Sequence, residues 1–214
     1  MHGGIVALLA LAALVGCGHV AWATPSNGWV LTFMVDDFTD NQLGLAGNSS
    51  SYNSVNGTMV GGNRDQIFVY GLSKDTDEEH VSNGHWVGDG SGEGSFAMQY
   101  DGADETETLD TKGLGSVDFT IDSGIAFELM IYVTWGSHVS AQVFTNGGSK
   151  SCNITVELTD NINDSFPYYM PFSDMPSCDF TQVSALQVTY PFPIDMRTDY
   201  VGVVRNGSIP TPTP

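Results

Sequence analysis

Apolar residues recur at every second position along much of this chain, and that period is the strongest constraint on its fold. The clearest case is Ile125, Phe127, Leu129, Ile131 and Val133, which alternate with a second set of side chains. Alternation of this kind places one set on each face of a β-strand, and the period of an amphipathic helix is nearly absent. About ten strands are predicted, the others near 29–35, 67–70, 96–100, 117–121, 139–143, 154–158, 168–172, 186–190 and 200–204.

Short turns separate these runs. Pairs such as Asn27-Gly28, Asn56-Gly57 and Asp101-Gly102 contain residues that tolerate a positive φ. Strands this close together, without helical crossovers between them, must pair mostly antiparallel. We therefore expect an all-β fold, an antiparallel β-sandwich of two sheets with a jelly-roll-like arrangement.

The two ends of the chain differ from the rest. Residues 1–23 contain an apolar run from Ile5 to Val15 and finish in Ala21-Trp22-Ala23, which is typical of a cleaved secretory signal. An uncleaved anchor is the alternative reading, and no later segment has the ~20 apolar residues of a membrane span. Residues 208–214 alternate Pro and Thr like the start of a linker or stalk, which leaves a single domain over 24–207 and predicts a secreted, extracellular protein.

In a secreted protein, cysteines can form disulfides and asparagines in sequons can carry glycans. Cys17 lies in the signal, and the remaining pair, Cys152 and Cys178, is most simply a disulfide in an oxidising compartment. Five N-x-Ser/Thr sequons would accept glycans in a eukaryotic host. They lie at Asn48, Asn56, Asn153, Asn163 and Asn206.

The charge excludes some partners. With 6 Lys and Arg against 25 Asp and Glu, the formal net charge is −19, which opposes binding to nucleic acid or to an anionic membrane. It leaves a highly soluble extracellular protein or a chelator of Ca²⁺.

Signatures of common enzymes are missing. The sequence has no GxSxG, HExxH, phosphate loop or GxGxxG followed by a helix. Carboxylate pairs for glycoside hydrolysis remain open, because 25 acids always offer some pair. Four aromatic residues could stack on sugar rings, although a core or sheet-edge role is the alternative for each: Trp86, Trp135, Tyr168 and Tyr169.

One of the scarce cations lies in Gly61-Gly62-Asn63-Arg64-Asp65, directly before an alternating apolar run. The paired glycines suit a tight entry into a strand, and Arg64 could bind Asp36 or Asp37 at the end of the first strand. We expect this segment to be architectural.

The order of several motifs resembles that of a known family. The motifs are Asp36-Asp37-Phe38, the Gly61–Asp65 segment, Tyr100-Asp101-Gly102, Gly113-Leu114-Gly115 with Val117-Asp118-Phe119-Thr120, Tyr169–Ser173, and Asp179-Phe180-Thr181. The chain thus resembles secreted bacterial proteins, many with a C-terminal sorting tail of the PEP type, in a family without an assigned function. A weaker similarity runs to galactose-binding-like jelly rolls, including carbohydrate-binding modules. This chain lacks the sorting tail.

The resemblance implies a secreted β-sandwich and no particular reaction. Our first hypothesis is a non-enzymatic extracellular module that binds carbohydrate or another surface component, needs no cofactor, and could hold a structural Ca²⁺. Because first and last strands are often neighbours in such sandwiches, Asp36, Asp37 and Asp199 are the suggested calcium ligands. The alternatives are a polysaccharide hydrolase or lyase with a carboxylate pair, and a structural matrix or coat protein.

Overall fold

The computed structural model describes residues 28–46, 50–70, 78–90, 93–104, 106–136, 138–159 and 161–207. The expected signal, the Pro/Thr tail and Asn48 lie outside the described residues, as does the side chain of Asn163. Of the other sequons, Asn56, Asn153 and Asn206 are exposed. Among the described residues, no helix has the length and apolar character needed to cross a bilayer.

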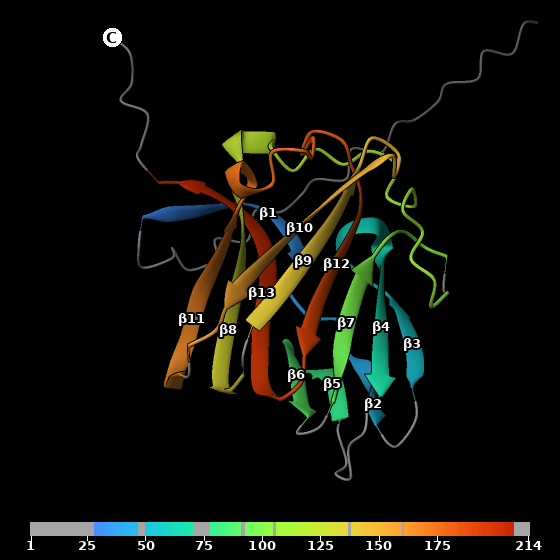
Figure 1. The fold of residues 1–214 in the computed structure, drawn as a ribbon, viewed down its shortest axis with the longest axis vertical. Coiled ribbons are helices and arrows are strands. Elements are labelled where there is room, and N and C mark those ends of the chain that lie inside the picture. Colours follow the sequence, from blue (N-terminus) through green and yellow to red (C-terminus); the bar gives the residue numbers. More distant parts are fainter. Residues whose placement is uncertain are drawn as a thin grey trace, which may run out of the picture.

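Two antiparallel sheets form the fold (Figure 1). The seven-stranded sheet has the order β11 (Asn161–Pro171), β8 (Ala126–Trp135), β13 (Ile194–Asn206), β6 (His85–Gly90), β5 (Glu78–Ser82) and β2 (Gln42–Ala46), and β1 (Trp29–Asp36) also pairs with β13. The six-stranded sheet has the order β10 (Lys150–Glu157), β9 (His138–Thr145), β12 (Val183–Pro191), β7 (Gly94–Tyr100), β4 (Asn63–Tyr70) and β3 (Ser51–Asn56). The expected all-β antiparallel sandwich is confirmed.

Short 3₁₀ turns complete the elements: η1 (Val60–Gly62), η2 (Ile121–Ser123) and η3 (Phe172–Asp174). The strand predicted near 117–121 is wrong. Val117 makes only an isolated bridge to Val183, and η2 begins at Ile121. The cause is local, because the Asp118 carboxylate accepts hydrogen bonds from the Thr120 N–H (2.8 Å) and hydroxyl (2.6 Å) and turns the chain out of the extended conformation.

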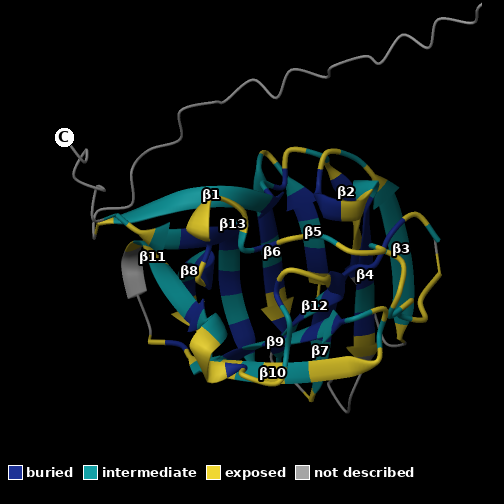
Figure 2. Ribbon diagram, turned by 90° about the horizontal axis from the view of Figure 1, so that it is seen from above, coloured by how far each residue is buried: buried dark blue, intermediate teal, exposed yellow. Residues whose placement is uncertain are grey.

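The core lies between the two sheets, where the buried residues gather (Figure 2). The strand predicted over 125–133 is β8, and its side chains Phe127, Leu129, Ile131 and Val133 are at most 1 % exposed. Ile125 lies just before the strand and is 45 % exposed. Alternation therefore identified the inward face from Phe127 to Val133 correctly, and it missed the start of the strand by one residue and its end by two.

The expected disulfide is present. Cys152 in β10 is bonded to Cys178, with a Cα–Cα distance of 6.0 Å. The bond ties the edge strand of the six-stranded sheet to the loop between η3 and β12. Such a bond is typical of proteins that fold in an oxidising compartment.

Candidate functional site

Three of the sequence motifs meet inside the sandwich, around Arg64. Its Nη1 lies 2.6 Å from Asp36 Oδ2, and the Tyr100 hydroxyl donates to the same oxygen at 3.0 Å. The Arg64 Nε donates to Gln42 Oε1 at 2.9 Å. The predicted pairing of Arg64 with Asp36 is thus confirmed, and because Arg64 is 0 % exposed, no ligand reaches it.

The glycines in front of Arg64 form the entry to β4. Gly61 and Gly62 have φ values of 80° and 77°, which residues with a Cβ rarely adopt. A Cβ on Gly61 would also lie 2.5 Å from the Leu114 side chain. Asp65, the last residue of the motif, is buried on the other face of β4 and takes part in the cluster described below.

Among the described residues, the three suggested calcium ligands are not grouped together. β1 does pair with β13, but Asp36 is bound to Arg64 and Asp37 accepts from the Thr39 N–H in its own loop (3.1 Å). The Asp199 carboxylate binds Arg197 Nε at 2.8 Å and His85 Nδ1 at 2.9 Å. The backbones of β1 and β13 are neighbours as expected, but the three carboxylates bind different partners.

The four aromatic candidates do not form a stacking surface. A stacking role for Trp86 is excluded, because its ring is 0 % exposed and its Nε1 donates to Glu79 Oε2 at 3.0 Å. Tyr168 packs partly against the core, and Tyr169 stacks on Trp29 with ring centroids 4.7 Å apart. Only Trp135, at the end of β8, is largely exposed, at 49 %.

Instead, a line of polar residues crosses the outer face of the six-stranded sheet. Its members are paired in register from strand to strand, and we call them the polar row: Asn153, Gln142, Gln187, Gln99, Asp65 and Ser54, on β10, β9, β12, β7, β4 and β3. The row faces outward because Val139, Ala141 and Val143 of β9 are buried in the core at the alternate positions. Gln99 Nε2 donates to Gln187 Oε1 at 2.8 Å, which links the row at its centre.

At one end of the row the sheet surface is hollowed. The hollow has a volume of about 200 Å³, and the outward side chains around it are amides and hydroxyls, without any charge. Its lining residues are Ser140, Gln142, Asn153, Thr155, Gln187 and Thr189, together with Ala141, whose side chain points into the core. Phe144, two residues after Gln142 on the same face of β9, is partly exposed beside them.

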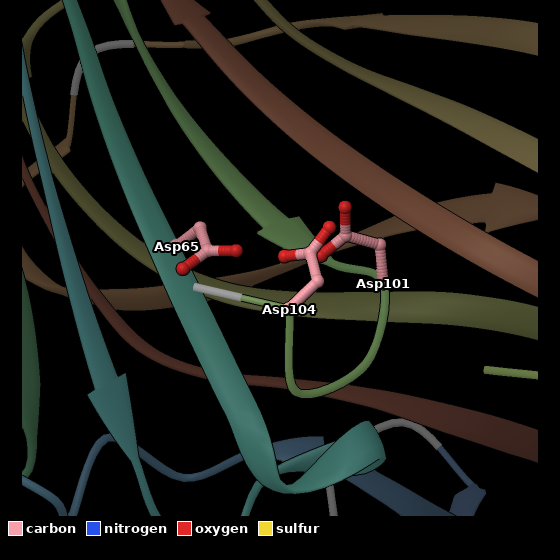
Figure 3. A group of neighbouring side chains, drawn as sticks. All are labelled: Asp65, Asp101 and Asp104. Carbon is pink, nitrogen blue, oxygen red and sulfur yellow. The ribbon is translucent and has the colours of Figure 1, made fainter. Parts of the chain in front are cut away.

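At the other end the row meets a cluster of carboxylates, Asp65, Asp101 and Asp104. Figure 3 shows the three side chains converging from β4 and from the loop that follows β7, and their ligand atoms lie within 4.8 Å of one another. Within the part of the chain that the structure describes, no other such group of His, Cys, Asp and Glu exists. Burial raises the pKa of Asp101 to about 7, and the charges of Asp104, Asp65 and Asp110 add to the rise.

A second pocket, of about 590 Å³, opens at one end of the sandwich. It is mainly apolar and includes Trp29, Ile125, Pro171, Phe172 and Phe180. The rings of Phe172 and Phe180 stack there with centroids 3.8 Å apart. None of the four aromatic candidates lines this pocket.

The sequence alone did not reveal the polar row or the hollow. Gln142, Gln187 and Asn153 stand at polar positions of alternating strands, so the pattern marks them as outward-facing. Their alignment across strands depends on the register, which no local pattern supplies.

No family model and no curated protein matches the chain. Among solved structures it is similar to the family 11 carbohydrate-binding module of the cellulosomal cellulase Lic26A-Cel5E of Clostridium thermocellum, with 12 % identity over 82 % of this chain and 94 % of that one and a TM-score of 0.38. The same kind of module in complex with a β-1,3-1,4-mixed-linked tetrasaccharide gives 14 % identity, 84 % and 95 % coverage and a TM-score of 0.36. A family 29 carbohydrate-binding module gives 11 % identity, 72 % and 86 % coverage and a TM-score of 0.37.

Proposed function

We propose that this chain is a secreted, non-catalytic module that binds a neutral glycan across the outer face of the six-stranded sheet. The observation that supports this best is the hollow at the end of the polar row, whose polar lining consists of uncharged amides and hydroxyls. Sugar hydroxyls both donate and accept hydrogen bonds, and a side-chain amide offers two donors and an acceptor to match them.

Two of the three lining amides are available to a ligand when Asn153 carries no glycan, whereas Gln187 is bonded to Gln99 and Thr189. Within the described residues, the side chains of Gln142 and Asn153 make no hydrogen bond, so a sugar would not have to displace an internal partner. Adjacent strands lie about 4.8 Å apart, a spacing close to the length of one pyranose ring. Gln142 and Gln187, on neighbouring strands, could therefore contact successive sugars of an extended chain.

The negative charge of the protein favours a neutral glycan over an acidic one. A net charge of −19 would repel uronic acids and sulfated sugars, so we expect a neutral polysaccharide. Phe144 offers an apolar surface for the C–H face of a sugar beside the amides. Because the hollow has no aromatic lining residue, the affinity for a single site should be low.

The geometry does not favour hydrolysis by the carboxylate cluster. Asp65 Oδ2 and Asp101 Oδ1 are buried atoms without accessible surface, so a glycosidic oxygen cannot reach either of them. A general acid must lie within hydrogen-bond distance of the oxygen that it protonates.

The test is affinity electrophoresis and calorimetry with soluble neutral polysaccharides, including β-1,3-1,4-mixed-linked glucan and xylan, alongside an acidic polysaccharide. Gln142→Ala and Gln187→Ala should each weaken binding about tenfold, because each removes hydrogen bonds worth about 1–1.5 kcal/mol. Gln182→Ala, which alters an exposed glutamine after η3, is the matched control and should leave the affinity unchanged. Failure to bind any neutral glycan, or equal affinity in all three variants, would refute the proposal.

A further inference from the structure

The carboxylate cluster brings three acids together, and no Lys or Arg is among the groups that act most on Asp101. The charges that act most on Asp101 come from Asp104, Asp65 and Asp110, and each of them is negative. Asp65 and Asp101 are 0 % and 1 % exposed, so water does not screen their repulsion. Buried carboxylates of this kind are normally paired with a cation or a metal ion.

Two oxygens inside the cluster have no hydrogen-bond donor. The Tyr52 hydroxyl donates to Asp65 Oδ1 at 2.9 Å, and the Asp110 N–H donates to Asp101 Oδ2 at 2.6 Å. The second oxygen of each carboxylate, Asp65 Oδ2 and Asp101 Oδ1, is buried and receives nothing. Figure 3 shows both carboxylates directed into the space that they share with Asp104.

The strand beside Asp65 carries a further buried oxygen without a donor. Gln99 is 4 % exposed and lies directly opposite Asp65 in the pairing of β7 with β4. Its Nε2 is used by Gln187, and its Oε1 is buried without a donor. Buried carboxylate and amide oxygens without a donor are the kind of atom that a hard cation binds.

From this geometry we infer that Asp65, Asp101 and Asp104 form a binding site for Ca²⁺. All three residues offer carboxylate oxygens, which Ca²⁺ prefers, and Asp104, the most accessible of the three acids, gives the ion a way in. The site is distinct from Asp36, Asp37 and Asp199, and it does not depend on glycan binding. Its affinity should lie in the range of extracellular modules, with Kd on the order of 10⁻⁴–10⁻³ M.

The experiment compares thermal unfolding of the purified secreted protein in EDTA and in Ca²⁺, with a calcium titration by calorimetry. At about 10 mM CaCl₂ the melting temperature should rise by about 3–10 °C over the value in EDTA. MgCl₂ at the same concentration should give a smaller rise, because Mg²⁺ requires a stricter octahedral geometry.

Two variants localise the effect. Asp101→Asn and Asp104→Asn should lose the calcium-dependent rise, whereas Glu157→Gln, which removes an exposed acid from β10, should keep it. In EDTA, Asp101→Asn should melt at or above the melting temperature of the wild type, because the neutral amide relieves the repulsion between carboxylates. If the buried Asp101→Asn variant does not fold, Asp104→Asn, at the more accessible position, still tests the site. An unchanged melting temperature of the wild type in Ca²⁺, a rise that persists in both Asn variants, or an equal rise with Mg²⁺ would each overturn the assignment.

Discussion

Arg64 shows how this acidic chain uses one of its few cations. It is one of only six Lys and Arg residues, and it is 0 % exposed. Besides Asp36 and Gln42, it donates from Nη2 to the Asp40 carbonyl at 2.6 Å, and its guanidinium lies 5.3 Å from the centre of the Phe38 ring. The residue fixes the loop after β1 against β4.

Removing Arg64 should therefore affect stability and leave ligand binding alone. Arg64→Ala leaves Asp36 buried without its counter-ion, which costs about 3–5 kcal/mol and lowers the melting temperature by about 6–20 °C. Scanning calorimetry measures the shift, and glycan affinity well below the melting temperature should stay at the wild-type value. Arg64→Lys, which keeps the charge and loses the fork of donors, should show a smaller drop. A variant that melts with the wild type would contradict the architectural role.

Glu79 predicts how stability depends on pH. Its side chain is 0 % exposed, and burial raises its pKa from 4.5 to about 8, against the opposing effects of Trp86 and Arg64. Because the folded state holds this proton more tightly than the unfolded state, its contribution to stability is full below the unfolded pKa and is lost as the pH rises through about 8.

Glu79→Gln should remove the pH-dependent contribution of this carboxyl to stability. Between about pH 6 and about pH 9, the variant should gain on the order of 2 kcal/mol of unfolding free energy relative to the wild type. Denaturant unfolding at several pH values measures this difference in unfolding free energy. Glu78→Gln, an exposed neighbour, should follow the wild-type curve. Parallel curves for Glu79→Gln and the wild type would show that the carboxyl does not titrate in this way.

At the scale of single elements, the sequence predicted those strands whose inward positions are apolar. β8, β9 and β12 follow the alternation closely. β2, β3, β5 and β6 were not predicted; in β2 and β5 the polar residues Gln42 and Glu79 are buried. A polar side chain at an inward position cancels the pattern from which a strand is recognised.

The candidate site was less accessible to sequence reasoning than the strands. The acidic composition of residues 101–110 is typical of a solvated loop, yet Asp101 is 1 % exposed. Alternation cannot distinguish an outward carboxylate in water from one covered by a loop, because coverage depends on contacts between distant segments. The motifs did locate Asp65 and Asp101, but their convergence follows from the pairing of β4 with β7.

At the scale of the whole molecule, the two functions that we infer share one face. The hollow and the carboxylate cluster lie at opposite ends of the polar row, joined through Gln99 and Gln187. The seven-stranded sheet on the other side holds both ends of the domain, because β1 and β13 are paired in it.

The pairing of the first and last strands has a mechanical consequence. Trp29 lies opposite Asn206, so β1 and β13 leave the domain side by side (Figure 1). Tension applied between the two ends of the chain would open this ladder one hydrogen bond at a time, as a zip opens. We predict a low unfolding force in single-molecule pulling from the termini. Pulling instead between the N-terminus and the turn that joins β12 to β13 shears the same pair and should need a force several times higher; equal forces would show that another part of the sandwich yields first.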